Sequence, residues 1–117
     1  MKRGEIWTAA GGGDYTGKPR PAVILQDDRF DATDSITICA FTTDPTDAPR
    51  FRIPVEPNEL NGLDIPSRVM LDKITTVRRA RLASRVGRLD DDDMARVNQA
   101  VLVFLGFAGS PTGGSGS

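Results

Sequence analysis

The segment from 11 to 28, GGGDYTGKPRPAVILQDD, joins a glycine-rich stretch with charged side chains to an apolar run. Gly12, Gly17 and Lys18 satisfy most of the G-x-x-x-x-G-K-[ST] pattern that cradles nucleotide phosphates. That chemistry needs a hydroxyl after the lysine and a helix that begins there, so that backbone N–H groups point at phosphate. Pro19 takes the hydroxyl position, and the residues after it predict a strand. The segment is therefore not expected to bind a nucleotide.

Histidine is absent from the 117 residues, which argues against most zinc sites, the serine and cysteine triads and the commonest general acid–base group. Cys39 is the only cysteine, and its apolar neighbours suit a small buried residue. A reducing cytoplasm fits this cysteine usage, and the sequence shows neither a signal-peptide pattern nor an apolar run of membrane-spanning length. An enzyme of this composition would use Asp, Arg, Lys, Thr, Ser or Tyr.

The net charge of −1 argues against a nucleic-acid binder, but the charge is unevenly distributed. Residues 68 to 88 carry seven basic side chains against one acidic side chain. A local basic surface can bind a phosphate backbone in a protein of neutral total charge, and the alternative is a set of solvated strand edges that resist aggregation. The candidate basic residues for backbone contacts are Arg68, Lys73, Arg78, Arg79 and Arg81.

The elements that must position these side chains are short β-rich segments separated by turn signals. This spacing predicts a mainly β (α+β) fold, a small barrel or sandwich of about five to seven short strands. Pro54 marks its segment as an edge strand or a strand end. The expected strands are 4–9, 22–26, 35–42, 51–55, 68–77 and 84–88, with one helical turn at 79–82.

A single helix is expected near the C-terminus. Its apolar stripe consists of Met94, Val97, Val101, Phe104 and Leu105. The four aspartates at 90–93 lie at its start, where carboxylates cap free N–H groups, and they lack the alternation and central glycine of a calcium loop. Gly106 is a natural stop. The chain is thus expected to form one domain over 1–109. Residues 110–117 have the composition of a flexible linker, and at least the last six are expected to be an artificial addition.

Three stretches resemble the MazF/PemK family of toxin endoribonucleases. They are MKRGEIW at 1–7 followed by GKPRPAVILQ at 17–26, ICAFTT at 38–43, and VMLDKI at 69–74 followed by Val77 and Arg81-Leu82. The resemblance covers residues 1 to about 107. It implies a barrel similar to SH3 folds, a homodimer, and cleavage of single-stranded RNA at short sequences without a metal or other cofactor. It also implies an antitoxin whose flexible segment lies across the substrate groove.

The resemblance also assigns roles to individual residues. Arg20 matches the family's active-site arginine and Thr42 its active-site threonine, while Asp72 falls where relatives often have an acidic residue near the groove. Asp14 and Lys18 belong to the loop that covers the substrate, and Asp14 stands in place of a glutamate nearer the arginine. The general base is left unassigned.

Tyr15, in the same loop, could stack on a base. Cleavage of RNA is also a reaction that the residue types present can catalyse. RNA carries its own nucleophile, the 2′-OH, so the enzyme must mainly stabilise the charge that develops on phosphorus. A guanidinium such as that of Arg20 matches phosphate oxygens bidentately, and one preorganised donor of this kind contributes about 3 to 4 kcal/mol.

Two other classes of protein remain open at this point. A toxin that jams DNA gyrase, as in the CcdB family with its similar fold, would not need the pair formed by Arg20 and Thr42. It would bind its target through the C-terminal helix. An SH3-like interaction module would need an aromatic-lined groove, whereas the seven aromatic residues here are scattered. Metal-independent RNA cleavage separates the endoribonuclease from both.

Overall fold

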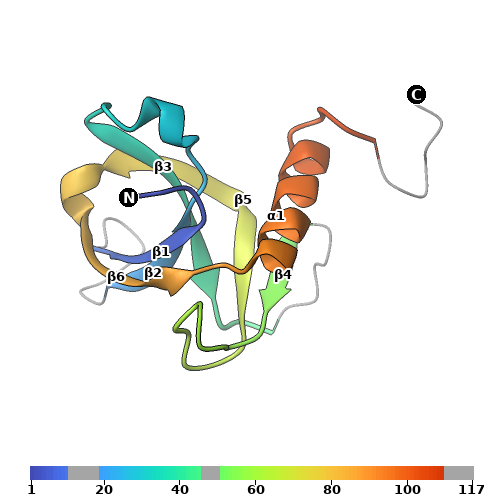
Figure 1. Cartoon of the computed structure of the whole chain (residues 1–117). Helices are drawn as coiled ribbons and strands as arrows, with labels where there is room; N and C mark the ends of the chain where they lie inside the picture. The colour runs from blue at the N-terminus through green and yellow to red at the C-terminus, as the bar shows by residue number, and fades with distance from the viewer. Residues whose placement is uncertain (11–18, 46–50, 110–117) are drawn as a thin grey trace.

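The computed structural model describes residues 1–10, 19–45 and 51–109 of the chain (Figure 1). Its strands are β1 (Glu5–Ala9), β2 (Arg20–Ile24), β3 (Ser35–Thr42), β4 (Arg52–Val55), β5 (Ser67–Arg78) and β6 (Leu82–Arg88), and its helix is α1 (Asp91–Phe104). Two 3-10 turns, η1 (Asp28–Phe30) and η2 (Arg79–Arg81), precede β3 and β6. The predicted mainly β chain with a C-terminal helix is thus confirmed, whereas the predicted tail at 110–117 lies outside the described residues.

The six strands form one antiparallel sheet in the order β4-β5-β3-β2-β1-β6. Figure 1 shows the sheet curling toward a barrel, with α1 beside β4 and β5. Pro54 lies on the edge strand β4, as predicted, because its missing N–H would leave a gap in a central ladder. β2 begins at Arg20, two residues before the predicted 22–26 strand. The extended geometry that proline imposes on the preceding residue suits a strand start, so the Pro19–Pro21 stretch enters the sheet earlier than expected.

The two faces of the sheet pack differently. The helix face carries Val23, Cys39, Phe41 and Leu71, which pack in the same buried cluster as Val97 of α1. The opposite face, here called the pocket face, holds a smaller buried cluster made of Ala22, Ile24, Ile36, Ile38 and Leu82. Alternation along each strand therefore sends neighbouring residues to separate cores.

A register shift in β5 decides which of its side chains reach the pocket face. Cys39 of β3 pairs with Ile74 and Phe41 pairs with Val69, so β5 places five residue steps against two on β3. The three extra residues are an odd number, and an odd shift sends all following side chains to the other face. Val69 before the shift and Ile74 after it consequently both pack on the helix face, and the alternation around Ile74 turns Lys73 and Thr75 toward the pocket face.

Helix α1 begins and ends where the sequence predicts. The Asp90 side chain caps it by accepting a hydrogen bond from the Asp93 backbone N–H at 2.8 Å. Gly106, with φ of +84°, adopts a left-handed conformation just beyond the helix, which a residue with a side chain rarely adopts. Among the described residues, no helix is both long enough and apolar enough to cross a membrane.

Candidate nucleic-acid interface

One cross-strand row brings the two main candidate residues together. Thr42 at the end of β3 pairs with Arg68 at the start of β5, and Arg20 at the start of β2 pairs with Ala9 of β1. The β2–β3 register runs through Ala22 opposite Ala40, and Arg20 and Thr42 each lie two residues beyond this pair. Arg68, Thr42 and Arg20 therefore come from three adjacent strands at the same edge of the pocket face.

Arg20 and Thr42 line a common surface pocket of about 170 Å³. Thr42 Oγ1 accepts a hydrogen bond from the Asp44 backbone N–H at 3.1 Å, and Arg68 Nη1 donates to the Asp44 carbonyl at 3.1 Å. The bond to Asp44 uses a lone pair of the Thr42 oxygen, so its hydroxyl proton remains available for a ligand. The other residues that line this pocket are Pro19, Pro21, Phe41, Thr43 and Ser67. A guanidinium and a hydroxyl at one pocket are groups that can bind a phosphate.

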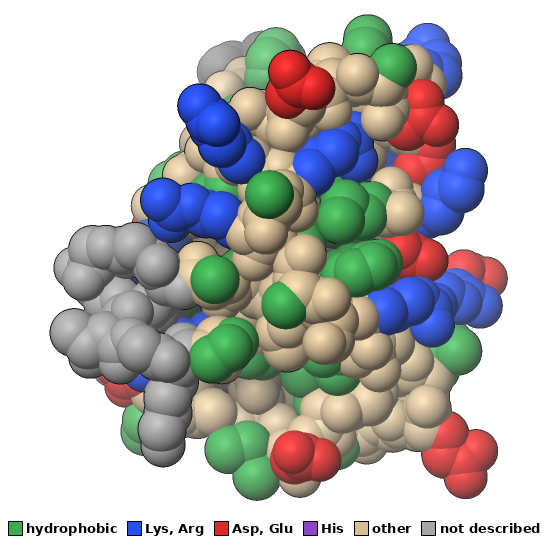
Figure 2. Space-filling model, turned by 90° about the vertical axis from the view of Figure 1, so that its left-hand side faces the viewer, with side chains coloured by type: hydrophobic (Ala, Val, Ile, Leu, Met, Phe, Trp, Pro, Cys, Tyr) green, Lys and Arg blue, Asp and Glu red, His purple; other side chains and the backbone are tan. Residues whose placement is uncertain are grey.

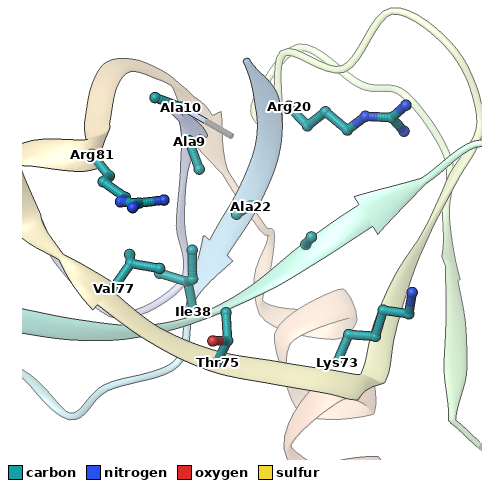
Figure 3. A pocket seen from close by; sticks show the side chains of 10 residues that line it. Ala9, Ala10, Arg20, Ala22, Ile38, Lys73, Thr75, Val77 and Arg81 are labelled. Atoms are coloured by element: carbon teal, nitrogen blue, oxygen red, sulfur yellow. The ribbon is translucent and has the colours of Figure 1, made fainter. Parts of the chain in front are cut away.

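A second pocket, of about 230 Å³, lies beside the first and shares Arg20 with it (Figure 3). Its lining is mostly apolar, with Ala22 and Ala40 opposite each other in the sheet register. Lys73 and Arg81 add two cations to Arg20 around this lining. Figure 2 looks onto the side of the molecule away from α1, where Lys and Arg side chains border hydrophobic ones.

The basic residues predicted for backbone contacts fall into two groups. Arg68, Lys73 and Arg81 lie in the row or the pockets that also involve Arg20. Arg78 lies at the far end of β5, opposite Ser35. Arg79 is engaged in the fold: its guanidinium donates to the carbonyls of Thr33 and Phe30, which ties η2 to η1 and to the segment that follows η1.

Asp72 forms a two-point ion pair with Arg52 of the edge strand β4. Arg52 Nη2 lies 3.2 Å from Asp72 Oδ2, and Arg52 Nε lies 3.3 Å from Oδ1. This partner differs from Lys73 and Arg68, its basic neighbours in the sequence. The contact belongs to the pairing of β4 with β5 and lies outside both pockets lined by Arg20.

Asp14, Tyr15 and Lys18 lie outside the described residues. Cys39 is buried, as predicted, and its thiol donates to the Met70 carbonyl at 2.7 Å. Burial, together with the negative charge of Asp72, raises the pKa of Cys39 to about 12. The thiol therefore stays protonated at neutral pH and is not a nucleophile.

Glu5 provides a charged anchor on β1. Its Oε1 accepts hydrogen bonds from the Lys2 backbone N–H at 2.8 Å and the Trp7 indole N–H at 3.1 Å, and its Oε2 accepts from Arg85 Nε at 3.1 Å. Burial alone would raise the pKa of Glu5, but these donors outweigh it and lower the pKa to about 2. Glu5 is thus ionised at any physiological pH and fixes the Trp7 ring beside the pocket-face cluster.

Sequence reasoning missed the small residues that shape the site. Ser67, Ala22 and Ala40 carry no ionisable group, and only the pairing of β2 with β3 reveals that the two alanines face each other. Thr75 was also missed, because the shift in β5 decides its face. An alanine in each of two adjacent predicted strands was the available signal, and it needs the register to become informative.

Comparisons with known proteins agree on one family. Residues 2–105 match the family described as "PemK-like, MazF-like toxin of type II toxin-antitoxin system". The "Probable endoribonuclease MazF" of Mycolicibacterium smegmatis is 59% identical over 109 residues, which are 93% of this chain and 100% of that protein.

Solved structures show the same fold. An "Endoribonuclease in complex with its cognate antitoxin from Mycobacterial species" matches with a TM-score of 0.76 at 21% identity, covering 94% of this chain and 99% of that chain. "Mycobacterium tuberculosis toxin MazF-mt6" matches with a TM-score of 0.71 at 24% identity, covering 84% and 92%. At these identities the matches carry the fold alone.

Proposed function

The chain belongs to the PemK-like, MazF-like toxin family of type II toxin–antitoxin systems, and from this premise we propose that it is an endoribonuclease toxin. It cuts single-stranded RNA at a short sequence, without a metal ion, by attack of the ribose 2′-OH on the adjacent phosphate. The M. smegmatis relative, named a probable endoribonuclease and covered over its whole length, supports the activity. The shared pocket of Arg20 and Thr42 is the observation that supports the site.

The reaction needs no nucleophile from the protein. The 2′-oxygen loses its proton and bonds to phosphorus, the bond to the 5′-oxygen breaks, and that oxygen takes up a proton. The products are a 2′,3′-cyclic phosphate and a 5′-hydroxyl. The phosphorane between them carries additional negative charge, which a fixed cation stabilises more than it stabilises the ground state.

Arg20 is assigned to that charge. It begins β2 between two prolines, so its backbone is restricted and its side chain starts from a fixed point of the sheet. Its planar fork suits two phosphate oxygens, and because guanidinium hardly deprotonates, Arg20 acts by electrostatics rather than as a base. Thr42 donates a hydrogen bond from its hydroxyl group to the same phosphate.

The remaining predicted residues take supporting roles in this proposal. Arg68, Lys73 and Arg81 hold neighbouring phosphates or bases, and Asp14, Tyr15 and Lys18 belong to a segment that covers the RNA. The ion pair with Arg52 supports a structural role for Asp72, so no proton transfer is assigned to it.

The proposal includes the biological setting of the family. A cognate antitoxin places a flexible segment across the RNA groove and so blocks it, in line with the related endoribonuclease solved together with its antitoxin. The toxin acts as a homodimer. It works in the cytoplasm, where its RNA substrate is found, and it occupies residues 1–109 as one domain, in line with the family match over 2–105.

The deciding experiment is cleavage of a long unstructured RNA in EDTA by the wild type, Arg20→Ala and Thr42→Val, with fragment ends mapped. We expect discrete cuts that leave 5′-hydroxyl ends. Loss of one donor to the transition state should lower the rate about 10²- to 10³-fold in each variant. Arg29→Ala is the matched control, because it removes one exposed positive charge whose ion pair with Asp27 is local.

Each outcome separates the alternatives. Cutting that survives Arg20→Ala at the wild-type rate would retain the enzyme and overturn the site. Absence of cutting by folded wild-type protein free of antitoxin would overturn the endoribonuclease, and inhibition of DNA gyrase would then be the assay to run. Thermal melts of all variants check that the fold persists.

A further inference from the structure

We propose that the second pocket beside Arg20 is a base-binding subsite that takes a guanine adjoining the scissile phosphate. This inference rests on the proposed function and adds to it a determinant of the RNA sequence that is cut. The observation behind it is a pocket with an apolar floor and cations at two opposite ends (Figure 3).

The floor suits a flat ring. Ala22 and Ala40 pair directly across β2 and β3, and Ile38 continues the same surface. Because alanine projects only one methyl group, two facing alanines leave a hollow that larger side chains would fill. The volume of about 230 Å³ is large enough for a purine ring. Unpaired RNA bases expose apolar faces of this shape when they are splayed out of a strand.

The cations give the pocket a direction. Arg20 belongs to this pocket and to the neighbouring one that Thr42 lines, so a phosphate bound by Arg20 lies between the two. In Figure 3 the side chains of Arg20 and Lys73 extend on the same side of the floor. That side is the sugar–phosphate side of the bound nucleotide, with Lys73 on a flanking phosphate.

Arg81 lies at the opposite end, where the edge of the base would arrive. Its side chain extends over the floor toward Ala22 in Figure 3, and its backbone carbonyl accepts a hydrogen bond from Ala10 N–H at 2.8 Å. η2, which Arg81 ends, is held at its other end by the hydrogen bonds of Arg79. The guanidinium is thereby carried on a backbone fixed at both ends.

The donors select the base. An arginine fork pairs with two adjacent acceptors, and guanine presents O6 and N7 side by side. Adenine carries an amino group where guanine has O6. Two donors, this amino group and a guanidinium N–H, would then face each other with no acceptor between them. Arg20, Lys73 and Arg81 offer donors only, and the Thr75 hydroxyl can donate as well as accept, so an acceptor-rich edge finds the most partners in this pocket.

The test uses short RNAs that contain the cut site mapped on the long RNA, altered one nucleotide at a time on either side of the scissile phosphate. At one of these positions, guanosine and inosine should be cut equally well, since both keep O6 and N7. Adenosine and 7-deazaguanosine should lower kcat/KM, by about 5- to 150-fold for a lost bidentate contact.

The protein variant that completes the test is Arg81→Ala, which removes the fork while Arg20 and Thr42 stay in place. The variant should still cut RNA. Its kcat/KM values for the guanosine and adenosine substrates should lie within about threefold of each other, a smaller ratio than that of the wild type. Arg29→Ala, a charge-matched control away from both pockets, should keep the wild-type preference.

Two results would overturn the subsite while leaving the endoribonuclease intact. One is wild-type cutting that is indifferent to guanosine at both neighbouring positions, and the other is an unchanged preference in Arg81→Ala. An absence of cutting by the wild type on every RNA is a different failure, since it removes the proposed function on which the subsite rests.

Discussion

The helix face and the pocket face are built from alternate residues of the same strands, yet they differ in the size of their buried cluster and in the charge around it. Phe41, Leu71 and Val97 on the helix face are at most 2% exposed. The pocket face has alanines and β-branched residues in its middle and cations at its rim. Both faces therefore bury apolar side chains, with the larger buried cluster on the helix face, whereas ligand chemistry is concentrated on the pocket face, where alanines are bordered by charge.

The largest expected effect sharpens this contrast. Leu71→Ala removes a fully buried side chain from the helix face and should lower the free energy of unfolding by about 2 to 5 kcal/mol. Thr75→Ala, four residues further along β5 on the pocket face, should change it by less than about 0.5 kcal/mol. Urea unfolding of both variants measures the difference. Similar losses of stability in the two variants would contradict this expectation.

A smaller effect is expected from Glu5, a charged residue that contributes to folding stability although it belongs to neither apolar cluster. Glu5 is a charged residue of β1 whose pKa in the folded protein is lowered to about 2 from 4.5. A lowered pKa contributes stability that is fully present above about pH 4.5 and is lost as the pH falls toward 2. The contribution at pH 7 is up to about 3 kcal/mol.

Urea unfolding at pH 7 and pH 3 gives the readout for Glu5. Glu5→Gln should be less stable than the wild type at pH 7 and should lose less stability on going to pH 3. An identical pH dependence in the two proteins would mean that other carboxylates govern acid unfolding.

The smallest effect compares two neighbouring arginines. Arg79→Met removes the guanidinium that donates to Thr33 and Phe30, with an expected cost of about 1 kcal/mol. Arg78→Met removes an exposed side chain at the end of β5 and should leave the melting temperature unchanged. Equal melting temperatures for the two variants would show that the Arg79 contacts contribute nothing measurable to stability.

The sequence predicted the elements that depend on local chemistry. The strand Ser35–Thr42 was located to the residue, and the cap of α1 was located to the run of four aspartates at 90–93, since alternation and capping are local patterns. The start of β2 was misplaced by two residues because the prolines around Arg20 were taken to hold a loop. Family resemblance singled out Arg20 and Thr42, and their catalytic roles stay predictions for the cleavage assay to decide.

The sequence did not predict the register, that is, which residues lie opposite each other in neighbouring strands. The partner of Asp72 is Arg52, twenty positions away in the chain, and Arg79 contacts a turn more than forty positions away. Such contacts follow from which strands pair and where they shift, and neither is encoded in a short window. The pocket formed by Ala22 and Ala40 was invisible for the same reason.

The shift in β5 makes one strand serve both faces. Val69 and Leu71 belong to the core on the helix face, and beyond the shift, with its three extra residues, Thr75 and Val77 line the pocket. The alternation of side chains between the two faces thus changes phase within this strand. Deleting a single residue within 70–73 would keep nearly the whole composition, yet it would exchange the faces of everything downstream in the strand. Insertions and deletions here should therefore be far less tolerated in related chains than substitutions, because they move an entire half-strand from the site into the core.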